Sequence, residues 1–254
     1  FTFGDNTSAV WTISETSTPK LVSTIEKVEF NGLEKPDGNL VNIDGVDYYK
    51  NYYGLRKITR EDNPIYDENG NVVGYNYKWI VSDNGYGESS NPILIYDLNS
   101  FETYFIQSNM GAYFRFVSDI DFSSKSANPT TSNLTFSGNI QGNNMRIDGL
   151  MIYSLESLES IGLFGKIESA DSSAYNSIRN LKVNASSVLA SRTQSVGVLA
   201  GIIQDYRLYN IELSADDVIV GSNAVGGLAG IVRGRFDIQN ITSSVSVNSV
   251  RAST

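Results

Sequence analysis

Two acidic side chains, Asp119 and Asp121, are spaced so that their carboxylates could act together in catalysis or in metal binding. Alternate residues of a β-strand point to the same face, so the two carboxylates would lie side by side if this segment is a strand. Paired carboxylates suit general acid–base catalysis or calcium binding. A solvated pair at a sheet edge explains the same spacing without chemistry. We favour that interpretation and keep calcium binding as the alternative.

A second group that could bind a ligand is aromatic, because most of the tyrosines fall between Tyr48 and Tyr96. Exposed aromatic rings can form a platform that stacks on sugar rings or on a protein partner. The simpler interpretation, which we favour, is that tyrosine is a good strand residue and is half-buried there. The candidate ligand contacts are Tyr48, Tyr49, Tyr52, Tyr53, Tyr75, Tyr77 and Trp79.

The composition excludes several kinds of site. The 254 residues include no Cys and no His, so the usual zinc, haem and iron–sulfur ligand sets and any His-based nucleophile–base pair are missing. The net charge of −9 argues against nucleic acid and anionic membranes as partners. No apolar run approaches the roughly 20 residues of a membrane-spanning helix. We therefore expect no cofactor, no metal centre and no membrane insertion.

The elements that position these side chains are built from a repeat. Similar short motifs begin at Ile147, Ile178, Leu208 and Ile238, about 30 residues apart. A second family of motifs carries the glycines Gly162, Gly197, Gly226 and Gly227. A fixed period of this size indicates stacked copies of one structural unit.

Each unit consists of short runs of Val, Ile and Leu separated by Gly, Asn and Ser, with no extended helical stripe. About 30 residues are enough for about three short strands with turns between them. We therefore predict an all-β fold: a right-handed parallel β-helix with about 30 residues per coil and about four coils over residues 110–250. Ile147, Ile178, Leu208 and Ile238 should stack in one interior column.

The corners of the predicted coils are marked by Gly149, Asn180, Asn210 and Asn240, which occupy equivalent places in the repeat. Glycine and asparagine tolerate the left-handed backbone region best, and a corner there lets both flanking apolar residues face inward. The three asparagines could hydrogen-bond one another as a ladder from coil to coil, or serve as three independent turn residues.

Three regions are predicted. Residues 1–21 resemble a strand at the end of a solenoid or a cap, and residues 22–90 form a Tyr-rich β-hairpin region with a turn at Asn69–Gly70. Residues 91–254 form the parallel β-helix. A short helix over residues 98–107, capped by Asp97 or Asn99, would cover the first coil.

Part of the chain resembles a known family. The V-G-G-L-A-G-I-V run at 225–232, followed by I-x-N-I, is similar to the GLUG motif of large bacterial surface proteins, which include adhesins and the non-catalytic region of immunoglobulin-A metallopeptidase-like proteins. Segments 91–96, 114–122 and 136–143 also resemble that family. The resemblance covers about residues 91–250. It implies a non-catalytic structural or adhesive segment that is secreted or lies at the bacterial cell surface.

Two other functions fit the sequence less well. Parallel β-helices also include polysaccharide-cleaving enzymes, whose sites gather several carboxylates on adjacent coils. Projection by one repeat places Asp216 between serines, so no acidic column forms, whereas Asp205 falls on Arg235 and Arg207 on Asp237, which predicts cross-coil ion pairs. The remaining alternative is a glycan- or host-protein-binding module that uses the Tyr-rich region.

Self-association, or contact with adjoining segments of a longer chain, is the expected partnership. Residues 1–21 resemble the close of a solenoid, and the coil that begins at Ile238 is incomplete at Thr254. Open backbone edges favour pairing with further strands. The sequence therefore suggests one unit of a longer fibre.

Overall fold

The computed structural model describes residues 11–12, 20–21, 27–31, 39–43, 45–51, 54–82, 85, 87–169 and 176–250. The protein is mostly β-strand and includes parallel sheets. The chain divides into two compact units, Phe1–Tyr86 and Gly87–Thr254. The boundary predicted from the sequence was after residue 90. None of the described helices is long and apolar enough to cross a membrane.

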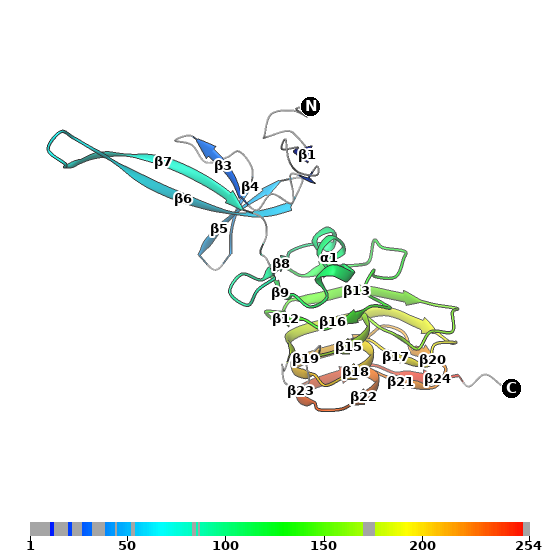
Figure 1. The fold of residues 1–254 in the computed structure, drawn as a ribbon. Coiled ribbons are helices and arrows are strands. Elements are labelled where there is room, and N and C mark those ends of the chain that lie inside the picture. The colour runs from blue at the N-terminus through cyan, green and yellow to red at the C-terminus, as the bar shows by residue number, and fades with distance from the viewer. Residues whose placement is uncertain are drawn as a thin grey trace. The chain divides into compact units, whose positions relative to one another are not determined.

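The unit Phe1–Tyr86 contains an antiparallel sheet of five strands in the order β3-β7-β6-β5-β4 (Figure 1). Its strands are β3 (Lys27–Asn31), β4 (Asn39–Ile43), β5 (Val46–Asn51), β6 (Gly54–Tyr66) and β7 (Val72–Ser82). Two short strands, β1 (Trp11–Thr12) and β2 (Lys20–Leu21), pair with each other in a separate sheet. They are the only described part of the region 1–21.

The long hairpin β6–β7 turns at the predicted Asn69–Gly70 position. The Asp67 carboxylate accepts hydrogen bonds from the backbone N–H groups of Asn69 at 2.9 Å and Asn71 at 2.8 Å, and Gly70 has φ +80°. The backbone hydrogen bond from Asn71 lowers the pKa of Asp67. This carboxylate therefore closes a turn.

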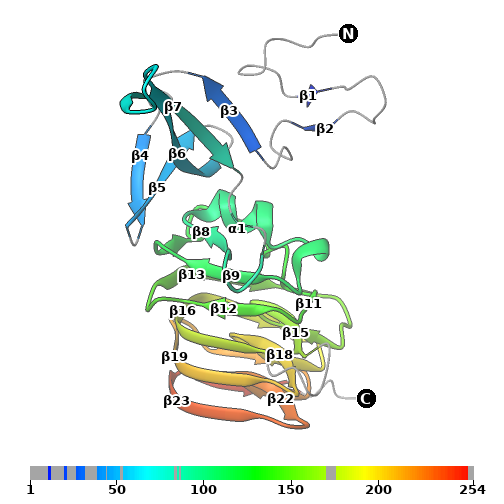
Figure 2. The same cartoon turned by 60° about the vertical axis from the view of Figure 1, so that its left-hand side comes forward.

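The unit Gly87–Thr254 is a stack of parallel strands, in which each passage of the chain, here called a layer, pairs with the one before it (Figure 2). It begins with β8 (Ile93–Ile95), α1 (Leu98–Tyr104) and a 3₁₀ turn (Gln107–Asn109). The first layers contain β9 (Tyr113–Phe116), β10 (Ile120–Asp121), β11 (Thr135–Phe136), β12 (Asn139–Gln141), β13 (Arg146–Tyr153), β14 (Ser160–Ile161) and β15 (Phe164–Glu168). The next are β16 (Ser177–Ala190), β17 (Ser195–Gly197), β18 (Ala200–Gln204), β19 (Arg207–Ala215), β20 (Ile219–Gly221), β21 (Ala224–Gly226) and β22 (Ala229–Arg233). Strands β23 (Asp237–Ser244) and β24 (Val247–Ser249) follow, and together with β22 they are called the last layer.

These strands form three parallel sheets. The largest holds ten strands, among them β9, β12, β16, β19 and β23, which lie one above another in Figure 2. The second has the order β11-β15-β18-β22, and the third β14-β17-β21. Because each layer contributes to more than one sheet, the inward side chains of all sheets share one core.

The interior columns confirm most of the predicted repeat and correct one member. Ile178, Leu208 and Ile238 are direct register partners, and the residue above Ile178 is Ile140. The prediction for Ile147 was wrong, because it pairs with Val183 instead. In the layer of Ile147, the first corner is formed by the four residues between β12 and β13. In the next layer, the equivalent corner is formed by the single residue Asn180. The motif at 147 therefore lies one strand further along its layer.

The helix closes the first end of the core. Asp97 caps α1 by accepting a hydrogen bond from the Ser100 backbone at 2.7 Å, as predicted, although the helix ends at Tyr104, before the expected residue 107. Phe101 within the helix and Phe105 directly after it are fully buried. The ring of Phe105 stacks on Phe114 with centroids 4.0 Å apart. The helix thus seals the interior with aromatic side chains.

The last layer leaves its inward positions open. Ile203 of β18 is fully buried, but its register partner Val232 of β22 is 36% exposed. Phe236 and Val247 nearby are 56% and 48% exposed. Apolar side chains that would belong to the core in earlier layers therefore face solvent here.

Among the described residues, Tyr206 is the largest fully buried side chain, and its hydroxyl donates a hydrogen bond to the Gly138 carbonyl. Burial raises the pKa of Tyr206 well above its ordinary value of 10.0. Above pH 10 the unfolded chain loses this proton while the folded chain keeps it, so stability is present below that pH and falls as pH rises. Urea titrations from pH 8 to 11 should show this decline.

The matched variant is Tyr206→Phe. It should be less stable by about 1–3 kcal/mol at neutral pH, because the Gly138 carbonyl loses its partner. Its stability should also fall less steeply above pH 10. An alkaline slope identical to that of wild type would contradict the assignment to Tyr206.

Candidate functional site

The asparagine corners form the predicted ladder. Asn180, Asn210 and Asn240 each have φ 55°. The Asn210 amide nitrogen donates to the Asn180 side-chain oxygen at 2.8 Å, and Asn240 donates to Asn210 at 2.9 Å. The ladder therefore joins three layers on the surface of the stack.

Gly149 does not belong to this column. Its φ is +69°, so the left-handed conformation is present, but it lies at a later corner of its layer, where a Cβ would be 2.7 Å from the Ser123 backbone nitrogen. The segment beside Asn180 in the preceding layer contains Asn143 and Asn144, and the Asn144 N–H donates to the Asn180 carbonyl at 2.7 Å. The equivalence predicted for Gly149 was wrong for the same reason as that of Ile147.

Substitution of Asn210 by leucine should destabilise the unit by about 1–2 kcal/mol, since leucine resists positive φ and both ladder bonds are lost. Asn210→Gly should cost less, because glycine accepts that backbone conformation. Thermal unfolding of the two variants and wild type would test this. Equal melting temperatures for Asn210→Leu and wild type would show that this corner requires neither a residue that tolerates positive φ nor the ladder hydrogen bonds.

The repeat glycines mark places where two stretches of backbone meet. A Cβ on Gly162 would lie 2.6 Å from Ala200 Cα, and one on Gly197 would lie 2.6 Å from Ala229 Cα. A Cβ on Gly226 would meet the carbonyl oxygen of Ala229. Gly227 differs, because there the nearest atom is the rotatable hydroxyl of Ser243.

The two candidate catalytic or calcium-binding aspartates are used as backbone acceptors. Asp119 accepts from the Arg146 N–H at 2.7 Å, and Asp121 accepts from the Ser123 N–H at 2.8 Å. The Ser123 hydroxyl and backbone N–H lower the pKa of Asp121. Among the described residues, no group of three or more acidic side chains is placed to hold a metal ion. Both aspartates are exposed. Asp121 closes a turn within its own layer, and Asp119 bonds to the backbone of the next layer.

Of the two predicted cross-coil ion pairs, the one between Asp205 and Arg235 takes a different form. Asp205 accepts from the backbone N–H of Arg235 at 2.7 Å. Arg207 and Asp237 are register partners, and Asp237 accepts a hydrogen bond from the Tyr209 hydroxyl at 2.7 Å. This bond raises the pKa of Tyr209. The same bond, the hydrogen bond from Gln239 and the charge of Arg207 lower the pKa of Asp237, so Arg207 and Asp237 interact across the layers as predicted.

The candidate aromatic platform is described only in part. Tyr48 is half-buried, and burial raises its pKa, whereas Tyr75 is 48% exposed. The side chains of Tyr49, Tyr77 and Trp79, and the whole of Tyr52 and Tyr53, lie outside the described residues. A ligand platform here stays a prediction.

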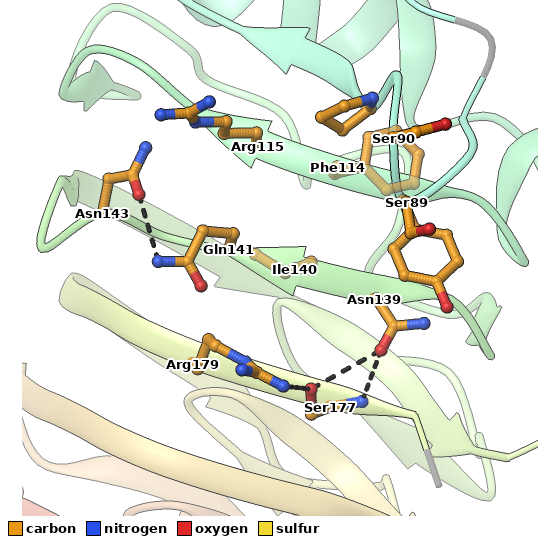
Figure 3. A pocket seen from close by; sticks show the side chains of 12 residues that line it. Ser89, Ser90, Phe114, Arg115, Asn139, Ile140, Gln141, Asn143, Ser177 and Arg179 are labelled. Carbon is orange, nitrogen blue, oxygen red and sulfur yellow. Dashed lines mark hydrogen bonds between the residues drawn. The ribbon is translucent and has the colours of Figure 1, made fainter. Parts of the chain in front are cut away.

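A groove that the sequence did not reveal lies on the outer face of the largest sheet, over β9, β12 and β16 (Figure 3). Its volume is about 500 Å³. Its lining is Ser89, Ser90, Pro92, Tyr113, Phe114, Arg115, Asn139, Ile140, Gln141, Asn143, Ser177 and Arg179. These residues include two arginines and no carboxylate.

The register explains why these side chains meet. Arg115, Gln141 and Arg179 are successive partners, and the column continues to Tyr209 and Gln239. They alternate along each strand with the buried column that contains Ile140, so they point outward. Figure 3 shows Arg115, Gln141 and Arg179 one above another.

Hydrogen bonds hold the groove in shape. Arg179 donates to the Ser177 hydroxyl at 2.8 Å, and the Ser177 backbone N–H donates to the Asn139 side chain at 2.9 Å. Gln141 donates to Asn143 at 3.1 Å, and Asn143 donates to the Phe116 carbonyl at 2.8 Å. The polar surface is therefore preorganised.

Comparison with known proteins does not place this arrangement in a family. No family model matches the chain, and searches of curated proteins and of solved structures found no match. The resemblance to GLUG-motif proteins therefore stays a prediction.

Proposed function

We propose that Gly87–Thr254 is a stretch of right-handed parallel β-helix in a non-catalytic structural or adhesive segment of a secreted or cell-surface bacterial protein. The in-register columns, the asparagine ladder and the glycines between adjoining layers support this proposal. Each layer before the last has its apolar side chains covered by its neighbours, which is how repeat proteins gain stability.

One observation carries the functional part of the proposal: the inward positions of the last layer are apolar and open. Val232 continues a column whose earlier members, Phe136, Ile167 and Ile203, are fully buried. Strand β22 is also an edge strand of its sheet. Another layer of parallel strands would cover these apolar side chains and also pair with the β22 edge. That layer would come from an adjoining segment or from a second copy. The segment then acts as one unit of a longer stalk or fibre.

Sedimentation velocity at rising protein concentration should show self-association through this open layer. Val232→Lys should suppress it, because a charge would be buried in the contact. Met151→Lys is the matched control, since Met151 is 42% exposed on β13, away from the last layer. A wild-type chain that stayed monomeric throughout would rule out a second copy as the covering, and identical behaviour of the two variants would show that the open layer is not the contact.

A further inference from the structure

The groove over β9, β12 and β16 combines positive charge, amides and an aromatic ring in a protein whose net charge is −9. Arg115 and Arg179 lie in one outward column with Gln141 between them. Neighbouring strands are about 4.8 Å apart, so the two arginine positions are separated by about 10 Å along the stack. The column therefore presents cation, amide and cation at regular steps.

We propose that this groove binds an acidic polysaccharide that carries a carboxylate or sulfate on every second sugar. One strand spacing is close to the length of one sugar unit in an extended chain. A polymer lying along the stack would then bring its charged sugars to Arg115 and Arg179 and the neutral sugar between them to Gln141. Arginine suits this role because its planar group can make two parallel hydrogen bonds to one anionic group.

The remaining side chains fit a sugar better than an acidic peptide. Tyr113 lines the groove, and the Tyr209 ring centroid lies next to it, 6.0 Å from the Arg179 guanidinium carbon. Tyrosine rings present an apolar face and a polar hydroxyl to a ligand, as sugars require. The groove lies on the face of the sheet, so a peptide could not pair with a strand edge there.

Hydrogen bonds already order the groove side chains before any ligand binds. Arg179 is held by Ser177 at 2.8 Å, and Gln141 is held by Asn143. Tyr209 is oriented by its hydrogen bond to Asp237 at 2.7 Å, which leaves the Asp237 carboxylate engaged below the groove. Side chains that are already ordered lose less entropy when a ligand binds.

Calorimetric titration of the whole chain with defined hexamers would test the proposal. The probes are alternating glucuronate and N-acetylglucosamine, a sulfated hexamer with the same alternation, neutral N-acetylglucosamine hexamer, and hexaglutamate peptide. At least one of the two acidic sugars should bind at least about tenfold more tightly than the neutral sugar and the peptide, and more weakly as salt rises.

Arg179→Gln and Arg115→Gln should each weaken binding of that sugar by at least about tenfold. Arg233→Gln is the matched control, because Arg233 lies on β22 and donates to Gln204 at 2.8 Å, outside the groove. Melting temperatures close to wild type would show that the variants are folded.

Three results would overturn the proposal: equal binding of the neutral hexamer, equal or tighter binding of the peptide, or unchanged affinity in the two groove variants. The proposal goes beyond the structural role above and does not depend on it. Binding is measured at concentrations where sedimentation shows a single species, so failure of self-association leaves this test intact.

Discussion

Gly197→Ala is expected to destabilise the unit Gly87–Thr254 by about 3 kcal/mol or more. The new methyl group would lie 2.6 Å from Ala229 Cα and would also meet the Ala200 carbonyl oxygen, both of which are backbone. Backbone on two sides cannot rotate away, so the strands β17, β18 and β22 would have to separate. Urea unfolding followed by far-UV circular dichroism would measure the loss.

Gly227→Ala is the control one layer later. Its methyl group would meet the Ser243 hydroxyl, which can rotate, and Val245 Cβ at 3.2 Å, which sits on the exposed last layer and needs to move only slightly. The residue at the equivalent place in the preceding layer is Val198. We expect a change of less than about 1 kcal/mol. If the two variants lost similar stability, close backbone approach would not be the reason for the glycine at 197.

The second large effect is expected for Phe136→Ala, at about 3–5 kcal/mol. Phe136 is fully buried, and its ring stacks on Phe164 with centroids 4.8 Å apart. Phe105 and Phe114 have ring centroids 6.1 Å from it. The substitution would leave a cavity between the helix-capped end and the aliphatic layers, which rigid neighbours fill only in part. Chemical denaturation would give the difference in free energy of unfolding.

Tyr153→Ala serves as the control, because Tyr153 is 55% exposed on β13. Its cost should stay within about 0.5 kcal/mol. A Phe136 variant no less stable than the Tyr153 variant would mean that the aromatic cluster is not part of the cooperative core.

The repeat could be predicted where its length is constant. Ile178, Leu208 and Ile238 are separated by equal numbers of residues, so their motifs lie in true register. The position of Ile147 could not be predicted in the same way, because similar sequence motifs occur at two different corners of a layer. Only the register shows that β12 and β13 together are the counterpart of β16.

The site was harder to predict than the fold. Arg115, Gln141 and Arg179 are separated by 26 and then 38 residues, unlike the equal steps of the later layers, so projection by about 30 residues does not align them. The spacing of Asp119 and Asp121 fits a catalytic or calcium-binding pair, yet each carboxylate accepts a hydrogen bond from a backbone N–H. Polar residues at corners are more often needed by the backbone than by a ligand.

The aromatic seal beneath α1 also bears on the order in which the chain can fold. The helix and β8 lie near the start of Gly87–Thr254, so they leave the ribosome before the layers that stack upon them. Phe101, Phe105 and Phe114 can cluster from segments close in sequence, which keeps the entropy cost of loop closure low. Every later layer then closes one loop of about 30 residues onto an existing edge. Folding of this unit can therefore proceed in the direction of synthesis, with each finished layer acting as the template for the next.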